Sequence, residues 1–291
     1  MLKLNYNGDD MKIDNLILSG TPVINFSEFP MSDPRKLSRI LKIDHRIIER
    51  WNNWVNIDGI WYYYKNFPNY SNPSANFLNE LIGEFLANYI ELETVNYNIG
   101  CMNLFGGEKN YGLLSRSFRK KEFKYITPYD VGVSPHQISL YNLENIRYLC
   151  KNDENYKKLV SQLLKMIALD IYMNQNDRTV NNFLFKKKNG NLELAPLYDY
   201  ERAFFVDKDI CNQPIGNYHA YILGLNLDNK EDIDKYPELK ELFDVFLSID
   251  INYVLDCIKE KFNLQIPFEL RDEYIKYNQK IKSLIKRKIN D

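Results

Sequence analysis

The sequence has few of the residue types on which several common kinds of site depend. It contains four cysteines, none of them in a CxxC pair, and only three histidines. A disulfide framework or a zinc site is therefore not expected, and the cysteine usage favours a reducing compartment. The histidines, His45, His136 and His219, lie far from one another and from the cysteines. This spacing argues against histidine-rich metal centres and against Ser-His-Asp hydrolases.

Long apolar runs and an excess of one charge are also missing. The chain has 38 Lys and Arg against 39 Asp and Glu, a formal net charge of −1. A protein whose main task is to cover nucleic acid with positive charge is therefore not expected. Residues 1–15 lack the apolar core of a signal peptide, and the most apolar stretch, 163–173, is interrupted by Lys165 and Asp170. These features predict a soluble, cytoplasmic protein without a transmembrane segment.

Hydrophobic residues make up 45% of the 291 residues, which is enough for a real core and for one or two domains. The first part of the chain predicts a small sheet with one main helix. An Asp-Gly turn signal precedes an aromatic run at 60–64 that favours a strand, and apolar residues at helical spacing predict a helix over 76–91. Further strands are expected over 96–104 and 111–118, and a short helix over 35–41.

The second part of the chain has mainly helical patterning. Helices are expected over 140–149, 156–173 and 251–262, and the last helix ends in a basic segment. A hairpin that turns at Asn189-Gly190 interrupts the helices. We therefore expect an α+β fold in which a sheet-rich segment is followed by a helical one.

The segment around this hairpin carries the most informative side chains. Asp177 and Asn182 lie five positions apart after the helix expected at 156–173, and Asp199 follows the hairpin. Magnesium takes hard oxygen ligands, which a carboxylate and an amide supply, while a second carboxylate can orient an attacking hydroxyl. The set therefore indicates phosphoryl transfer. Each residue also has a plainer interpretation, because an isolated Asp-Arg pair is usually a surface or capping feature and Asp199 could be a turn residue.

Phosphoryl transfer also needs a cation on the nucleotide phosphates. Lys65 stands at the end of the aromatic strand, and the helix expected next carries Glu84, so that strand, loop and helix follow in the order that protein kinases use. Glu80 lies one helical turn before Glu84 and competes with it for the role of partner to the lysine. We favour Glu84. The alternative is that Lys65 is a solvated lysine at a strand end.

With these residues identified, the motifs YYYK, GEF, YGLLSRSF, NDRTVNN and APLYD resemble the HipA-like kinase family, which includes HipA toxin kinases and the smaller CtkA-type secreted kinases. The resemblance implies a bilobal, protein-kinase-like fold. It implies that Asp177 is the catalytic carboxylate, that Asn182 and Asp199 bind Mg²⁺, and that Lys65, oriented by Glu84, contacts the phosphates of ATP.

The same resemblance implies an adenine site next to Ser115, Ser117 and Phe118, at the end of the strand expected over 111–118. Two departures stand out. Thr179 replaces the histidine usual in the family, and no glycine-rich phosphate loop precedes Lys65.

These observations predict an N-lobe over 1–128 and a helical C-lobe over 129–291. The predicted function is ATP- and Mg²⁺-dependent phosphorylation of Ser or Thr hydroxyls in a protein substrate. An antitoxin and the chain itself, through autophosphorylation, are further candidate partners, and secretion as an effector is left open. The alternatives are a pseudokinase that acts as a binding module, and a kinase for phosphoinositides or other small molecules.

Overall fold

The computed structural model of the chain describes most of the elements expected from the sequence. The described residues are 4–5, 11–13, 16–18, 23–29, 31–32, 53–67, 73–103, 109–131, 146–175, 178, 182–204 and 230–290. The helix expected over 35–41 and most of the one expected over 140–149 lie outside these ranges. Among the helices in the described ranges, none is both long and apolar enough to cross a membrane.

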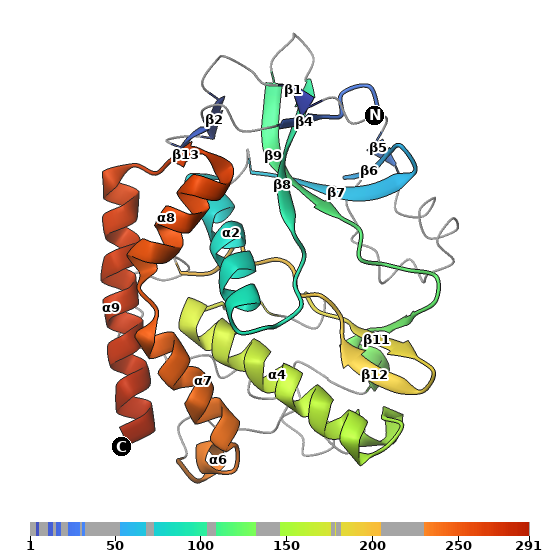
Figure 1. Cartoon of the computed structure of the whole chain (residues 1–291), viewed down its shortest axis with the longest axis vertical. Helices are drawn as coiled ribbons and strands as arrows, with labels where there is room; N and C mark the ends of the chain where they lie inside the picture. Colours follow the sequence, from blue (N-terminus) through green and yellow to red (C-terminus); the bar gives the residue numbers. More distant parts are fainter. Residues whose placement is uncertain are drawn as a thin grey trace.

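A seven-stranded sheet dominates the first part of the chain (Figure 1). Its strands are β1 (Leu4–Asn5), β4 (Val23–Asn25), β5 (Met31–Ser32), β6 (Trp54–Ile57), β7 (Ile60–Asn66), β8 (Tyr97–Asn103) and β9 (Lys109–Arg116). They lie in the order β1-β4-β8-β9-β7-β6-β5, with β4 and β8 parallel and the other neighbours antiparallel. The strands expected over 60–64, 96–104 and 111–118 are confirmed, with small shifts at their ends.

The β6–β7 hairpin holds Lys65 in place. Asp58 and Gly59 form its turn, and both have positive φ, 50° and 83°, as a two-residue turn between twisted strands requires. On the other side of β7, Lys65 is paired with Leu113 of β9. The lysine therefore stands on a strand that has neighbours on both sides.

The main helix of the first part is α2 (Pro73–Tyr89), which confirms the helix expected over 76–91. It is buried over most of its length, because it packs under the sheet and also against α4 (Asp153–Met173) and α8 (Ile251–Phe262). Figure 1 shows α2 at the centre of the molecule, between the sheet and the helices of the second part. A charged side chain on its inner faces is thus in reach of both parts of the chain.

Helices form most of the second part, as expected. Besides α4 and α8, they are η2 (Pro128–Val131), α6 (Lys230–Asp234), α7 (Pro237–Ser248) and α9 (Phe268–Asn290). The N-cap of α4 is Asn152, whose side chain accepts a hydrogen bond from the backbone N–H of Asn155, and the helix ends at Asn174 in the left-handed conformation, with φ of 48°. This end of α4 leads directly into the segment of the candidate site.

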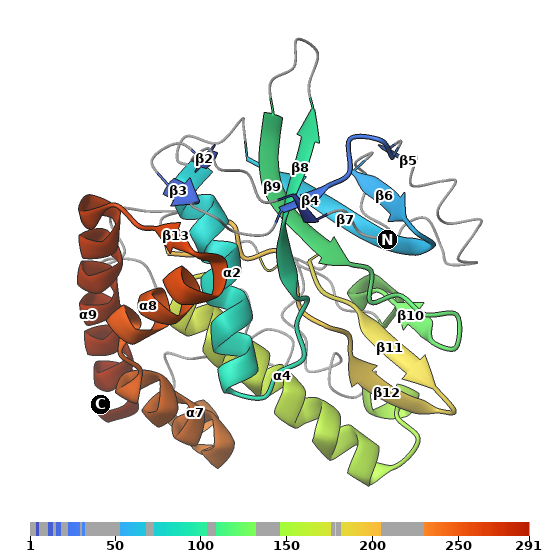
Figure 2. The same ribbon diagram turned by 45° about the horizontal axis from the view of Figure 1, so that its top comes forward.

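Two small sheets complete the fold. One joins β10 (Lys124–Ile126), β11 (Phe185–Lys188) and β12 (Asn191–Leu194), and the other joins β2 (Met11–Ile13), β3 (Leu16–Leu18) and β13 (Leu264–Gln265). The first contains the expected hairpin with its Asn189-Gly190 turn, and Figure 2 shows β10 beside it. Because β10 precedes residue 128 but pairs with β11, the strand pairing crosses the expected lobe boundary, which stays a prediction.

Candidate functional site

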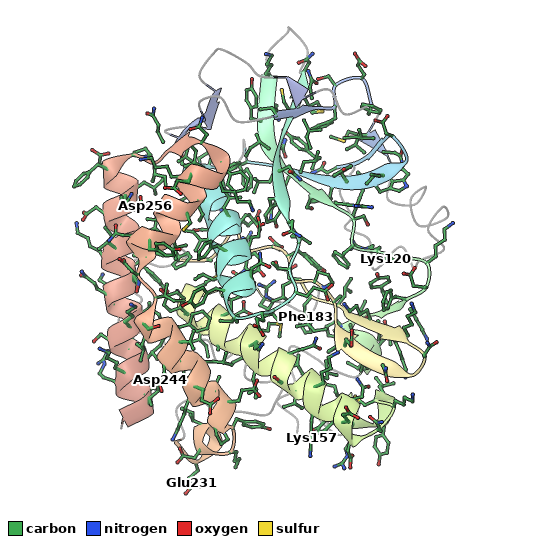
Figure 3. The ribbon with its side chains drawn as sticks, viewed as in Figure 1. Lys120, Lys157, Phe183, Glu231, Asp244 and Asp256 are labelled. Carbon is green, nitrogen blue, oxygen red and sulfur yellow. The ribbon has the colours of Figure 1, made fainter. Side chains whose placement is uncertain are left out.

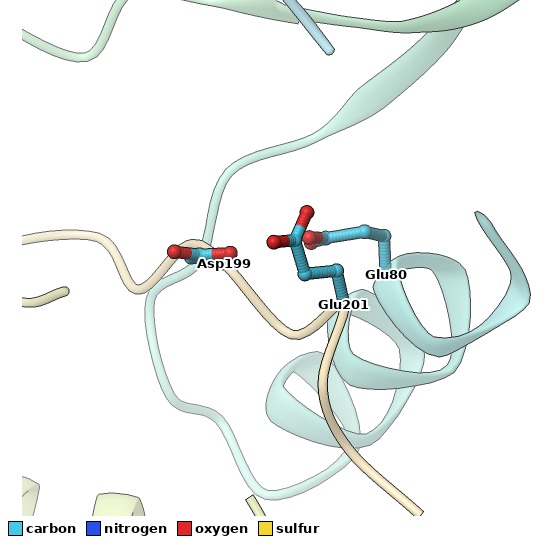
Figure 4. Close-up of side chains that lie close together, drawn as sticks. All are labelled: Glu80, Asp199 and Glu201. Atoms are coloured by element: carbon cyan, nitrogen blue, oxygen red, sulfur yellow. The ribbon is translucent and has the colours of Figure 1, made fainter. Parts of the chain in front are cut away.

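Three carboxylates surround the ammonium group of Lys65. Its Nζ lies 2.5 Å from Glu80 Oε1, 2.6 Å from Asp199 Oδ1 and 2.9 Å from Glu201 Oε2. Glu80 comes from α2, whereas Asp199 and Glu201 come from the segment after β12, and Figure 4 shows the three acidic side chains converging. The predicted phosphate-binding lysine and the predicted metal ligand Asp199 are therefore in direct contact.

The partner of Lys65 on α2 is Glu80, and the expectation that Glu84 would hold the lysine is wrong. Glu84 Oε1 instead accepts a hydrogen bond from Lys261 Nζ on α8, at 2.7 Å, and its Oε2 accepts from the backbone N–H of Tyr97. The Tyr97 hydroxyl donates to Glu80 Oε2 at 2.6 Å, so Glu80 is fixed from two sides. Both glutamates are buried, which is why helical spacing alone does not separate them.

The charges of this cluster shift one another's ionisation. Burial disfavours the charged form of Lys65, yet the surrounding carboxylates, Asp199 foremost, hold the pKa of the lysine well above its usual value. Burial is the largest single effect on the Asp199 carboxylate and raises its pKa, but the charge and hydrogen bond of Lys65, together with the charges of Arg178 and Arg202, outweigh it and lower the pKa of Asp199. For Glu80, burial is the largest effect and raises its pKa, against the influence of Lys65. Asp199 therefore stays ionised at neutral pH.

The backbone at Asp199 is held in an unusual conformation. Its φ is 67°, in the left-handed region that residues other than glycine rarely adopt. Its carbonyl accepts a hydrogen bond from the buried Gln175, whose Nε2 lies 2.5 Å away, beyond the end of α4. Such a conformation costs free energy and persists only where neighbouring groups enforce it. Here it turns the Asp199 carboxylate toward Lys65.

Arg178 ties the predicted metal ligands to the helical part of the molecule. Its Nη1 donates to the carbonyl oxygens of Asn182, at 3.0 Å, and of Tyr198, the residue before Asp199. Its Nε and Nη2 each lie 3.1 Å from a carboxylate oxygen of Asp170 on α4. The segments that carry Asn182 and Asp199 therefore meet at one guanidinium group.

The donor chemistry fits a hard divalent cation. Asp199 and Glu201 offer carboxylate oxygens, which with those of Glu80 all lie within 4.8 Å of one another, and the expected ligand Asn182 is half-buried. Oxygen ligands of this kind suit Mg²⁺. The expected catalytic residue Asp177, and Thr179 beside it, lie outside the described residues, so the structure describes no contact of theirs.

A small, open cavity lies beside the cluster, and its lining includes residues expected at both ends of a nucleotide. Arg119 and Phe118 border it, and the Arg119 guanidinium stands 4.7 Å from the centre of the Phe118 ring. The described residues thus provide a single space that reaches from the lysine cluster to the expected adenine site. The cavity is lined in part by Trp54, Lys65, Ser115, Ser117, Phe118 and Asp199.

Sequence reasoning missed some members of the site. Glu201 follows Asp199 by two positions, and a second carboxylate this close to an expected metal ligand was a signal present in the sequence. Tyr97 carries no such signal, because its contact with Glu80 joins two elements whose spacing in the fold is set by packing. The segment in which a phosphate loop would be sought, residues 33–52 between β5 and β6, lies outside the described residues.

Comparisons with known proteins bear on the fold. No family model matches the chain, and no curated protein matches it. Among solved structures, the proinflammatory kinase CtkA of Helicobacter pylori is similar with a TM-score of 0.57 at 13% sequence identity, over 92% of this chain and 97% of CtkA. HipA of Shewanella oneidensis MR-1, solved with HipB and its operator DNA, has a TM-score of 0.48 at 13% identity, over 78% of this chain and 58% of HipA. The likeness to CtkA confirms the predicted kinase-like fold.

Proposed function

We propose that the protein is an ATP- and Mg²⁺-dependent kinase that phosphorylates Ser or Thr hydroxyls of a protein. The observation that carries this proposal is the contact of Lys65 with both Glu80 and Asp199 at a cavity of a kinase-like fold. A lysine braced by a helix glutamate, next to a metal-binding aspartate, is the arrangement that phosphoryl transfer requires in protein kinases. The geometry therefore supports phosphoryl transfer better than any other chemistry.

Each residue has a role that follows from its position. Lys65 binds the nucleotide phosphates, Glu80 orients Lys65, and Asn182 and Asp199 hold Mg²⁺. The bound Mg²⁺ supplies positive charge that neutralises the triphosphate. Asp177, which the sequence predicts between α4 and Asn182, accepts or orients the proton of the attacking hydroxyl. The rate enhancement comes from positioning and from fixed charges, as is general for this reaction.

The adenine lies at the other end of the cavity, beside Ser115, Ser117 and Phe118. The backbone N–H of Ser117 already donates to the Trp61 carbonyl at 2.8 Å, which fixes the end of β9 against β7. This strand end is consequently rigid before a nucleotide arrives. Preformed positioning of this kind lowers the cost of binding, because fewer groups need to be ordered.

The substrate class rests on the resemblance to HipA-like kinases and on the likeness to CtkA, which is described as a kinase. HipA was solved together with HipB in a toxin–antitoxin system, and an antitoxin is a candidate partner here on the same ground. Autophosphorylation requires no partner and is the simplest reaction to test. We propose that the protein acts in the cytoplasm, and secretion as an effector is the alternative.

The direct test is incubation of the purified chain with Mg²⁺ and γ-labelled ATP, alone and with a generic protein substrate. We expect label on the chain or on the substrate, and we expect Asp177→Ala and Asp199→Asn each to abolish it. Lys286→Ala, on the basic end of α9 outside the cavity, serves as a control that keeps activity. Labelling that survives both site substitutions contradicts the proposal.

A pseudokinase that acts as a binding module without transferase activity is the second candidate, and one contact favours it. The Glu201 carboxylate forms an ion pair with Lys65, with its Oε2 2.9 Å from Nζ, and so competes with a phosphate for the ammonium group. Thermal unfolding separates the candidates: the absence of Mg²⁺-dependent stabilisation by ATP supports the binding module. Label transfer to phosphoinositide vesicles in preference to protein supports a lipid kinase instead.

A further inference from the structure

The buried ion pair between Arg178 and Asp170 has no part in the proposed phosphoryl transfer. Both side chains are completely buried. The guanidinium uses Nε and Nη2 on the Asp170 carboxylate and Nη1 on the carbonyls of Asn182 and Tyr198. Its face also lies 4.9 Å from the centre of the Tyr200 ring. Arg178 thus contacts helix α4, the expected catalytic loop and the segment after the hairpin.

The two carbonyl groups belong to the backbone of the expected metal ligands. One is the carbonyl of Asn182 itself, and the other is that of Tyr198, bonded directly to Asp199. Because both oxygens bind the same nitrogen of Arg178, the guanidinium fixes the separation of the two peptide groups. Mg²⁺ demands near-ideal octahedral geometry, so its affinity depends on that separation.

The need for stability does not by itself explain the pair. Removing two charges from water is costly, and an apolar pair of similar volume often stabilises a core as well. A guanidinium, however, presents five N–H donors in a rigid planar fork, and neither an apolar side chain nor lysine can hold three segments at defined angles. Asp170 is fixed on α4, which ends at Met173, and so provides a rigid anchor for that fork. The pair therefore fixes the orientation of these three segments relative to one another.

We propose that Arg178, held by Asp170, is a positioning residue that sets Asn182 and Asp199 at the spacing that Mg²⁺ requires. The proposal rests on the proposed function. It assigns to Arg178 no contact with the nucleotide or with the phosphoryl acceptor. The role is to hold the ligand-bearing backbone, and groups of this kind typically change metal affinity 10–100-fold when they are altered.

Two substitutions test the proposal from its two ends. Arg178→Lys keeps the charge but loses the fork, and Asp170→Asn keeps the shape of the anchor but loses its charge. The matched control is Arg271→Lys, since Arg271 on α9 makes similar contacts with Asp256, at 2.8 Å, and with the side chain and carbonyl of Asn252 on α8. Figure 3 labels Asp256 near the outer helices, and neither it nor Arg271 lines the cavity.

For each variant, the melting temperature is measured at a fixed ATP concentration over a range of Mg²⁺ concentrations. The quantity compared is the Mg²⁺ concentration that gives half of the maximal increase over the melting temperature of the same variant without ligand. We expect Arg178→Lys and Asp170→Asn to raise it at least about tenfold, and Arg271→Lys to change it less than about twofold. The labelling rate of the two site variants should recover as Mg²⁺ is raised, which a purely structural defect does not produce. Asp170→Asn keeps the test valid where Arg178→Lys fails to fold.

The outcomes separate this inference from the proposed function. Wild-type protein that shows no Mg²⁺-dependent stabilisation by ATP overturns the proposed function and, with it, the role of Arg178. A wild-type response together with site variants that match Arg271→Lys in their Mg²⁺ requirement overturns the positioning role alone. In that case the ion pair contributes to stability only, and its effect is confined to the melting temperature.

Discussion

At the residue scale, the surroundings of Lys65 determine what the proposed nucleotide site can bind. An ammonium group has three N–H donors, and here Glu80, Asp199 and Glu201 lie within hydrogen-bonding distance of it. Three negative charges therefore face one positive charge, and a triphosphate alone would be repelled. A divalent cation that arrives with the nucleotide reverses this balance, so we expect nucleotide binding to depend strongly on the metal.

The two glutamates of α2 should differ sharply in their effect on activity. Glu80→Gln removes the charge that holds Lys65 and should lower the rate of label transfer on the order of a hundredfold. Glu84→Gln is the matched control, because Glu84 contacts Lys261 and Tyr97 and not Lys65. Its rate should stay within about threefold of the wild type. Equal losses in the two variants would contradict the assignment of Glu80.

The Lys65–Asp199 pair should also affect acid stability. The pKa of Asp199 is lower in the folded protein than in the unfolded chain, so its contribution is present above the unfolded value of about 3.9 and is lost as the pH falls through the folded value. Wild type and Asp199→Asn should therefore differ by a constant unfolding free energy above about pH 5, and the difference should shrink below pH 4. Urea unfolding from pH 3 to pH 7 measures this. A difference that is unchanged at pH 3 would show that Asp199 is not paired.

Sequence reasoning reached Lys65, Asn182 and Asp199 because their residue types and spacing are characteristic of phosphoryl transfer. It chose Glu84 over Glu80 because two inward positions one turn apart look alike along a helix. The choice is made by tertiary packing, which brings Lys261 to the later glutamate and leaves the earlier one to Lys65. That information is absent from the local pattern.

At the element scale, α2 is held against the segment that carries Asp199. Gly83 faces the ring of Tyr200 so closely that a Cβ at this position would stand 2.3 Å from the ring. Tyr200 in turn packs on Arg178, and its hydroxyl lies 3.1 Å from Thr94 Oγ1. Glycine therefore allows the helix to approach the site, at the expense of helix propensity.

The reverse substitution should reveal this close approach. Alanine in a helix interior normally stabilises by about 1 kcal/mol relative to glycine, but Gly83→Ala should destabilise by about 1–3 kcal/mol because its Cβ displaces the Tyr200 ring. Asn88→Ala, at an exposed position of the same helix, should be neutral or slightly stabilising. Urea unfolding of both variants makes the comparison, and a stabilised Gly83→Ala protein would show that the approach is looser than described.

Elements with strong local patterns were predicted well, and distant pairings were not. The period of apolar residues indicated α2 and α8, and the Asn189-Gly190 turn marked the β11–β12 hairpin. The pairing of β10 with β11 was not predicted, because strands far apart in the sequence leave no shared local period.

At the scale of the whole molecule, hydrogen bonds connect helix α9 to the candidate site. The Tyr274 hydroxyl on α9 donates to Asn79 Oδ1 at 2.7 Å, and Asn79 Nδ2 donates to the carbonyls of Glu201 and Ala203. Asn79 is the neighbour of Glu80, so this chain of hydrogen bonds runs from the C-terminal helix to the partner of Lys65. The helix that orients the lysine is thereby fixed in position.

Loss of the Tyr274 hydroxyl should weaken this support. Tyr274→Phe keeps the ring packed on Phe204 but leaves a buried acceptor on Asn79 without its donor, which should cost about 1–3 kcal/mol of unfolding free energy. Nucleotide-induced stabilisation should decrease as well. Tyr89→Phe, at a half-exposed position on α2, should change neither quantity. If both variants behave like the wild type, α9 does not contribute to the position of α2.

The pairing of β13 with β3 has a consequence for the order of assembly during synthesis. Leu264 lies opposite Leu18, so one edge of β3 has no partner from β13 until translation has reached Leu264. At roughly 5–20 residues per second, that interval is on the order of ten seconds or more. During that interval the open edge of β3 can pair with a strand of another chain, and β13 removes this route to association when it docks.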